Sequence, residues 1–296
     1  MMKPGSALLA ATLALLLQAC STVPPAGERT LAASQRAVAA GLMPQRMTAG
    51  SLPLQGFVRS GCAVGEPLAV YIEGDGYAWV SVELPSTDPT PVNPVALQLA
   101  IVDPACSVAY LGRPGQYLQE KGNARYWLEA RFAPEVIDSY VAVIARLAQE
   151  RKASVIHVTG YSGGGAVAAL VAARLAQGPI GITLRTVAGN LDTATWAKRR
   201  RLTPLAASLN PADVAAALAD VPQLHLAGTR DRQVPLYVLD AFLARLPAQH
   251  CVRKLYVEAG HGGPWEDAWR RYAGETPACL SPAFREANPP SPAEKR

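Results

Sequence analysis

A serine, an aspartate and a histidine occur in the order Ser162, Asp231 and His261, each within three residues of a glycine. A serine hydroxyl is a weak nucleophile at neutral pH, so it needs a base that removes its proton. A histidine can act as that base, and an aspartate can fix the imidazole tautomer and stabilise the cation that forms. The three residue types could therefore carry out acyl transfer through an acyl-enzyme.

The serine lies between two recognisable elements. Val155–Val158 is a short, mostly β-branched run that is typical of a strand in a parallel sheet, and Ala166–Ala176 has the spacing of an apolar helix. A serine in a sharp turn between them adopts a strained backbone, and the residues two before and two after it must lack side chains. Gly160 and Gly164 meet that need, so we predict a functional turn around Ser162. A glycine-rich turn with an incidental serine is the simpler alternative.

The Gly160-Tyr161-Ser162-Gly163-Gly164 segment resembles the nucleophile elbow of the α/β-hydrolase family. The resemblance implies a mostly parallel twisted sheet with helices on both faces and a short cap. A loose dinucleotide fingerprint also begins at Gly163, but that fold needs an acidic residue at the end of the next strand. The predicted strand over residues 182–188 is followed by no acidic residue before Asp192. We therefore favour the hydrolase interpretation and predict no cofactor.

By the same resemblance, Asp231 is the triad acid, because it follows a predicted strand over residues 223–227, and His261 is the base, because it follows the last one. Asp192 is a competitor, since some members of the family carry the acid after the strand next to the elbow. Asp220 precedes a strand and should lie at the opposite edge of the sheet. Of the other histidines, His157 and His225 fall inside strands and His250 at a strand edge.

The family resemblance also implies an oxyanion hole built from two backbone N–H groups. One would belong to Gly163, and the other to Asp75, after the predicted strand Leu68–Ile72. The family often has His-Gly where this chain has Glu73-Gly74, which leaves Asp75 and Gly76 as alternatives for the second donor. A simple β-turn would also explain the Gly-Asp-Gly segment.

Aromatic residues next to these positions predict an apolar pocket for a substrate. The candidates are Tyr77, Trp79, Tyr161 and Trp265. Arg113, Tyr126 and Trp127 lie in a loop that should face the same crevice, although surface packing is the more expected role for each. The connection over residues 189–221, where the family commonly carries its cap, is short. Its basic run, Lys198–Arg201, is more typical of a solvated helix face than of a lipid-binding cluster.

The N-terminal residues predict export. Residues 1–19 have the charged, apolar and small-residue regions of a secretory signal, and Leu17-Gln18-Ala19-Cys20 resembles the lipobox of bacterial lipoproteins. Cys20 would then carry lipid and anchor the protein, with Ser21 favouring the outer membrane facing the periplasm. Ordinary secretion is the alternative. We predict a tether and lead-in over residues 20–50, one hydrolase domain over 51–285 and a disordered tail over 286–296.

Export changes the interpretation of the cysteines. An even number remains after Cys20, which in an oxidising compartment predicts two disulfides. Three pairings are possible, and we favour Cys62 with Cys106 and Cys251 with Cys279, because each pair flanks neighbouring predicted elements. The sequence has no clustered metal-ligand motif, so we predict no metal.

The chain of 296 residues has a net charge of +5 and no stripe of alternating aromatic and basic residues, which argues against nucleic-acid binding. The function we predict is hydrolysis of a carboxylic ester, with a small-molecule or acyl substrate as partner. A peptidase or thioesterase of the same fold is an alternative. So is a non-catalytic envelope lipoprotein that uses the scaffold to bind a partner. The sequence gives no indication of oligomeric state.

Overall fold

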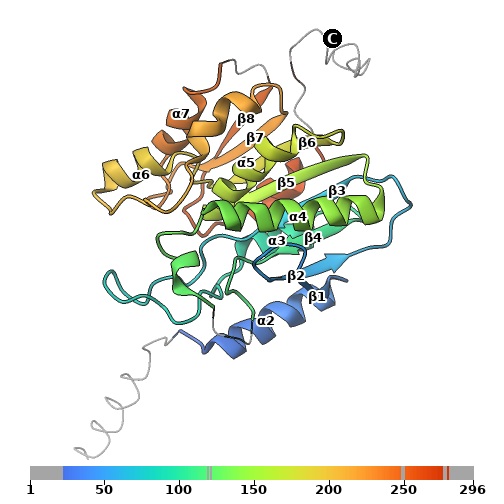
Figure 1. The fold of residues 1–296 in the computed structure, drawn as a ribbon, viewed down its shortest axis with the longest axis horizontal. Coiled ribbons are helices and arrows are strands. Elements are labelled where there is room, and N and C mark those ends of the chain that lie inside the picture. The colour runs from blue at the N-terminus through green and yellow to red at the C-terminus, as the bar shows by residue number, and fades with distance from the viewer. Residues whose placement is uncertain (1–22, 119, 121, 248–250, 276–278, 280–296) are drawn as a thin grey trace, which may run out of the picture.

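A computed structural model describes residues 23–118, 120, 122–247, 251–275 and 279 (Figure 1). The fold is built on an eight-stranded sheet with the order β1-β2-β4-β3-β5-β6-β7-β8. The strands are β1 Met43–Met47, β2 Leu54–Arg59, β3 Leu68–Ile72, β4 Val108–Leu111, β5 Val155–Tyr161, β6 Gly181–Val187, β7 Gln223–Gly228 and β8 Val252–Val257. All neighbours from β4 to β8 are parallel, whereas β1 with β2 and β2 with β4 are antiparallel. The predicted mostly parallel sheet is confirmed.

Helices cover both faces of this sheet, and α4 crosses the face nearer the viewer in Figure 1. The helical elements are α2 Ala26–Ala39, α3 Val95–Val102, η1 Ala124–Tyr126, α4 Pro134–Arg151, α5 Gly163–Leu175, α6 Thr193–Arg200, η2 Pro211–Leu218, α7 Leu236–Leu243 and α8 Glu266–Tyr272. Buried side chains of α4, α5, η2 and α7 form one core, and those of α2, α3 and α8 form the other. The connection that was expected to carry the cap contains α6 and η2, and the buried side chains of η2 belong to the first core.

Strand β3 shows how the sequence serves both cores at once. Leu68, Val70 and Ile72 point toward the α4 and α5 core, while Ala69 and Tyr71 point toward the α3 and α8 core. Side chains alternate between the two faces of a strand, so a strand that is covered on both sides must be apolar at every position. This burial fixes β3 beside β5 and brings the loop after β3 next to Ser162.

The N-terminal region differs from the expected tether. Residues 26–39 form α2, in which Ala33 and Ala37, one helical turn apart, are buried against the second core. Pro25 stands at the N-cap, where proline fits because the first helical N–H groups lack partners in any case. Strand β1 then pairs with β2. The folded unit therefore includes α2 and β1 and begins before the expected boundary at residue 51.

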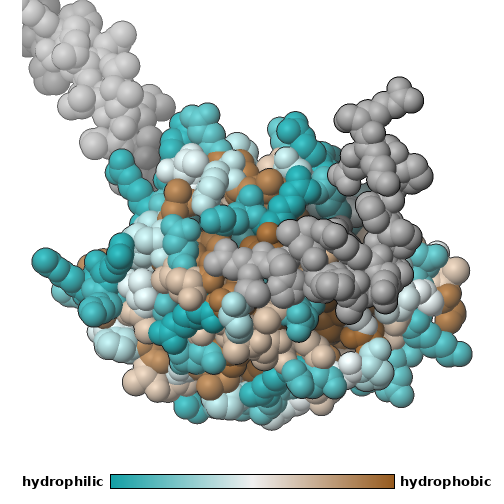
Figure 2. Space-filling view, turned by 90° about the horizontal axis from the view of Figure 1, so that it is seen from above, coloured by the Kyte–Doolittle hydropathy of each residue, from teal (hydrophilic) through white to brown (hydrophobic). Residues whose placement is uncertain are grey.

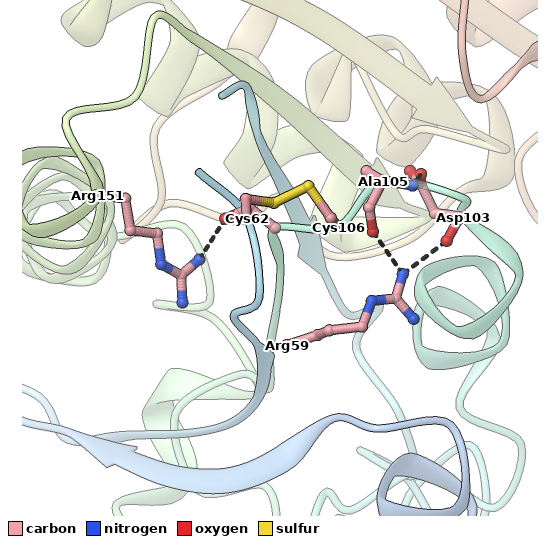
Figure 3. The surroundings of a disulfide bond; sticks show 7 residues. Arg59, Cys62, Asp103, Ala105, Cys106 and Arg151 are labelled. Carbon is pink, nitrogen blue, oxygen red and sulfur yellow. Dashed lines mark hydrogen bonds between the residues drawn. A yellow bond between two sulfur atoms is a disulfide. The ribbon is translucent and has the colours of Figure 1, made fainter. Parts of the chain in front are cut away.

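Both predicted cysteine pairs are joined. The disulfide between Cys62 and Cys106 links the segment after β2 to the turn before β4 (Figure 3). Arg59 lies beside it and donates to the backbone oxygens of Asp103 and Ala105, at 2.6 and 2.8 Å. The second disulfide links Cys251, just before β8, to Cys279. Crosslinks of this kind stabilise a fold by about 2–4 kcal/mol each, largely by restricting the unfolded chain.

Candidate active site

The turn between β5 and α5 places Ser162 in a strained conformation, with φ 53° and ψ −121°. A Cβ on Gly160 would lie 2.1 Å from the carbonyl oxygen of Gly164, and one on Gly164 would lie 2.3 Å from that of Ile72. Larger residues cannot fit at either position, as the sequence predicted. The strain at Ser162 costs on the order of 1–3 kcal/mol and persists because the surrounding core holds the turn. Its hydroxyl is thereby presented at the carboxyl edge of the sheet.

The structure brings the three predicted residues into one hydrogen-bonded chain. Nε2 of His261 lies 2.9 Å from Oγ of Ser162, and Nδ1 of His261 lies 2.8 Å from Oδ2 of Asp231. The Asp231 side chain is fully buried, whereas that of His261 is 11% exposed. Oδ1 of Asp231 accepts hydrogen bonds from the N–H groups of Gln233 and Val234, at 2.8 and 2.9 Å.

This arrangement determines the tautomer of the histidine. A carboxylate can only accept a hydrogen bond, so Nδ1 of His261 must carry a proton and donate it toward Asp231. Nε2 of the neutral ring is then an acceptor, and the hydroxyl of Ser162 donates to it. A base and a nucleophile in this relation are prepared for proton transfer.

The competing residues have other partners. Oδ1 of Asp192 accepts from the N–H of Thr195 at 3.0 Å, which caps the N-terminus of α6. His225 is fully buried in β7 with Nδ1 2.8 Å from Oγ1 of Thr186, and burial lowers its pKa to about 3. His157 in β5 pairs with Thr183, and burial, with the charge of Arg185, lowers its pKa to about 3 as well. His250 lies outside the described residues.

Two of the aromatic residues expected in the substrate pocket support the histidine loop instead. The hydroxyl of Tyr161 donates to the backbone oxygen of His261 at 3.0 Å, and the indole N–H of Trp265 donates to the same oxygen at 2.9 Å. Trp265 is only 1% exposed, so it packs beneath the loop and does not line an open pocket. Buried indoles need such a partner, and here the partner is the backbone of the candidate base.

Both residues proposed for the oxyanion hole lie side by side. Gly163 opens α5, where N–H groups have no partner within the helix. A Cβ on Gly163 would lie 2.1 Å from Oδ1 of Asp75, so only glycine allows this approach. The alternative donor, Gly76, lies against the backbone of Pro89. Because Gly76 lies against Pro89, Asp75 is the one of the two alternative donors that contacts the start of α5.

An anionic side chain at this place would oppose the charge of an oxyanion, but two arginines flank it. Arg113 approaches Oδ1 of Asp75 at 3.0 Å, and Arg131 approaches Oδ2 at 2.7 Å. Burial raises the pKa of Asp75, but the positive charges of Arg131 and Arg113 outweigh that effect and the pKa is lowered. The cluster therefore carries one net positive charge, and the part of it that contacts Gly163 is the neutralised carboxylate of Asp75. Sequence reasoning missed Arg131, and the only signal was an arginine between the apolar residues Ala130 and Phe132.

A second buried carboxylate holds the same loop. Glu73, 1% exposed, accepts hydrogen bonds from the N–H of Gly74 at 2.8 Å, from the N–H groups of Ala96 and Leu97 at the start of α3, and from the hydroxyl of Tyr110. Burial raises its pKa to about 7, although these hydrogen bonds oppose the rise. In the sequence, Glu73 differs from the family pattern, but nothing there indicates its contacts with α3.

The raised pKa of Glu73 predicts a pH-dependent stability. A carboxyl group whose pKa is higher in the folded state binds its proton more tightly there, so its stabilising effect is complete below about pH 4.5 and is lost as the pH rises through about 7. We expect the free energy of unfolding of the wild type to fall by about 2 kcal/mol more than that of Glu73→Gln between pH 5 and pH 8. Urea unfolding at both pH values measures the difference, in which the contributions of His157 and His225 cancel. Parallel changes in the two proteins would refute this assignment.

The remaining candidate lining residues are distributed around the loop after β3. Tyr77 is partly buried, with the Arg29 guanidinium 5.1 Å from its ring centroid, and Trp79 is 43% exposed. Trp127 is 4% exposed and donates to the backbone oxygen of Ser86, while Tyr126 bonds Glu135. Arg113 was expected mainly to pack at the surface, but it pairs with Asp75 and is therefore part of the site. Among the described residues, no group of three or more histidine, cysteine, aspartate or glutamate side chains could hold a metal ion.

No protein-family model and no curated protein matches the chain. Solved structures do resemble it, among them Est1E from Butyrivibrio proteoclasticus, with 13% identity and a TM-score of 0.53 over 78% of this chain and 97% of that one. An alpha-beta serine hydrolase homologue from Coxiella burnetii has 14% identity and a TM-score of 0.54 over 77% and 93%. A bacterial membrane phospholipase A has 16% identity and a TM-score of 0.50 over 96% and 97%. Together with the observed sheet, these neighbours show that the chain has the α/β-hydrolase fold.

Proposed function

We propose that this protein is a serine hydrolase that cleaves carboxylic esters through an acyl-enzyme. The observation that supports it best is the continuous chain of hydrogen bonds from Ser162 through His261 to Asp231. A histidine with only a structural role would not need a strained serine on one side and a fully buried aspartate on the other. The strain at Ser162 and the glycines required around it are further support.

The geometry supports the following sequence of steps. Nε2 of His261 takes the proton of Ser162 as Oγ attacks the ester carbonyl carbon, and the carbonyl electron pair moves onto oxygen. The N–H groups of Gly163 and Asp75 would stabilise that oxyanion. When the tetrahedral intermediate collapses, the protonated His261 gives its proton to the departing alkoxide. Water, deprotonated by the same histidine, then attacks the acyl carbon. Collapse of this second tetrahedral intermediate breaks the bond to Oγ of Ser162, which takes the proton back from His261 as the acid is released.

The net positive charge of the cluster of Asp75, Arg113 and Arg131 supports the same proposal. A charge that is already in place costs no reorganisation when the oxyanion forms. One of the compared structures is a membrane phospholipase A, and a phospholipase A is an ester hydrolase. Carboxylic esters are therefore the substrate class that we favour for the present chain over peptides and thioesters.

A panel of p-nitrophenyl esters with acyl chains of increasing length tests the proposal. We expect hydrolysis of at least one member and covalent labelling by a fluorophosphonate probe. A matched peptide p-nitroanilide panel separates the alternative, since a peptidase would cleave amides at comparable rates. Absence of both hydrolysis and labelling in folded protein would contradict the proposed function.

We also propose that the protein is an envelope lipoprotein anchored through Cys20, outside the described residues. The lipobox-like sequence before Cys20 and the two disulfides support export. We expect Cys20→Ala to move the protein from the membrane fraction to the soluble fraction, because a single lipid-carrying cysteine would be lost. Immunoblots of fractionated cells measure this, with the change of an exposed residue just after the cysteine, Val23→Ala, as the matched control. The membranes are washed at high salt before blotting, which removes protein held only by charge. Association that survives this wash unchanged in Cys20→Ala, with the signal shown to be cleaved, would rule out the anchor.

A further inference from the structure

The loop between β3 and α3 ends in an exposed apolar hairpin, residues 79–84, which we call the apolar tip. Trp79, Val80, Val82 and Leu84 are 43%, 50%, 95% and 56% exposed. Exposed apolar residues are common when scattered singly, but four of them within six consecutive residues concentrate apolar surface on one hairpin, which is typical of an interaction site.

Hydrogen bonds at its base hold the apolar tip in place, although its own side chains are exposed. The N–H of Val80 donates to the backbone oxygen of Leu84 at 2.8 Å, and the N–H of Ser86 donates to that of Ala78 at 2.9 Å. Below these bonds, the buried indole of Trp127 donates to the backbone oxygen of Ser86 at 3.1 Å. The hairpin therefore presents its apolar side chains on a rigid base.

The apolar tip lies at the same edge of the sheet as the candidate active site. Its loop leaves the carboxyl end of β3, where a Cβ on Gly74 would lie 3.3 Å from that of Ser162. Helix α6, with the basic run Lys198–Arg201, follows the carboxyl end of β6 on the other side of β5. Figure 1 shows this loop and α6 extending toward the same end of the molecule. Hydrophilic side chains project from that end in Figure 2, with hydrophobic surface beside them.

The N-terminus of the folded unit is attached to the same region. Arg29 in the first turns of α2 bonds the backbone oxygen of Thr90, lies 3.8 Å from Asp88 and stacks over Tyr77. Tyr77, Asp88 and Thr90 form the base of the loop that carries the apolar tip. Cys20 stands six positions before the start of α2, within about 20 Å of extended chain.

We propose that the apolar tip inserts into an anionic lipid surface, with Lys198–Arg201 on lipid phosphates, so that the Ser162 site faces the membrane and takes esters presented there. The four cations of Lys198–Arg201 would bind the phosphates of the headgroup region, and the apolar side chains of the tip would enter the acyl-chain region beneath it. The tip has one acidic residue, Glu83, against these four positive charges. No helix among the described residues is long and apolar enough to cross a bilayer. The choice of substrate rests on the proposed function, but the docking does not.

Docking can be measured through Trp79 in the full chain. Vesicles of phosphatidylglycerol with brominated acyl chains should quench the tryptophan emission of the wild type more than that of Trp79→Phe. Trp127, Trp265 and Trp269 are buried, and the half-buried Trp196 in α6 is present in both proteins, so the difference between them reports Trp79. Replacing phosphatidylglycerol with phosphatidylcholine, or introducing Lys198→Glu with Arg201→Glu, should lower the quenching roughly tenfold at limiting lipid. Equal quenching in the wild type and Trp79→Phe would overturn the insertion of the tip.

Activity then separates docking from catalysis. Val82→Asp should lose roughly tenfold or more of the hydrolysis of a long-chain ester embedded in phosphatidylglycerol vesicles, and should keep hydrolysis of a short soluble ester. The matched control is Val64→Asp, a valine 71% exposed in the segment before β3, at the opposite edge of the sheet, which should change neither rate.

Two results would overturn the docking, and a third would separate it from the proposed function. If Val82→Asp lowers both rates equally, the tip supports the active site and the docking proposal fails. If the wild type sediments as a dimer and Val82→Asp as a monomer, the tip is an interface between copies, which also overturns the proposal. If quenching occurs as expected but the wild type hydrolyses no ester, the docking is upheld and the proposed function is wrong.

Discussion

Replacing Ser162 with alanine should lower ester turnover by about 10⁶-fold, which is the scale seen when the nucleophile of a serine hydrolase is removed. Within the part of the chain that the structure describes, the hydroxyl of Ser162 bonds only His261, so we expect the melting temperature to change little. The measurement is turnover of the best ester in the panel, together with fluorophosphonate labelling and thermal unfolding. A purified protein free of host esterases is essential at this sensitivity.

Ser154→Ala is the matched control, because Ser154 is exposed and precedes the amino end of the strand whose other end carries Ser162. It should keep wild-type turnover and labelling. Equal labelling of Ser162→Ala and the wild type would show that another residue reacts with the probe. Folded Ser162→Ala with near-normal turnover would remove the acyl-enzyme mechanism altogether.

The turn around Ser162 was predictable because its requirements are local. A positive φ at the serine and close backbone approaches at Gly160 and Gly164 leave few residue types to choose from, so the pattern is visible in five consecutive letters. The strand before Asp231 was predictable for a related reason, because β7 is buried at every position and is mostly apolar in sequence. Strand β8, before His261, lies at the edge of the sheet and is partly exposed, and only its last residues, 255–257, form an apolar run.

The residues around Asp75 could not be found in the same way. Arg113 and Arg131 reach Asp75 from distant parts of the chain, and neither has a local pattern that distinguishes a buried ion pair from a solvated side chain. The role of Glu73 depends on α3, whose sequence VALQLAIV is apolar at every position except Gln98 and so lacks helical periodicity. Long-range partners of this kind are set by packing, which one sequence does not display.

The N-terminal helix was missed for a different reason. The buried residues of α2 are one arginine, Arg29, and two small residues, Ala33 and Ala37, so the helix has no apolar stripe of large side chains. The prolines before it favoured an extended interpretation. The expected substrate pocket was partly wrong because sequence neighbours need not share a surface. Trp265 packs under the histidine loop, while Trp79 lies in the exposed apolar tip.

Asp231 and Asp192 offer a second test of the site, because the same change can be made at two buried aspartates. Asp192 caps α6 through Thr195, and asparagine is nearly as good a cap as aspartate. We expect Asp192→Asn to keep turnover within a few-fold of the wild type and to change stability by only a few tenths of a kcal/mol. It therefore controls for the loss of a buried negative charge near the carboxyl edge of the sheet.

Asp231→Asn should lower turnover by roughly 10³- to 10⁴-fold while the melting temperature changes little. The side-chain oxygen of asparagine can still accept from the N–H groups of Gln233 and Val234, so the loop keeps its backbone bonds. Its amide nitrogen then faces Nδ1 of His261 as a donor, which forces Nδ1 to accept and places the ring proton on Nε2. A protonated Nε2 cannot take the proton of Ser162, and the nucleophile is no longer activated. Turnover and thermal unfolding of both variants decide the assignment, since normal activity in Asp231→Asn with loss in Asp192→Asn would make Asp192 the acid.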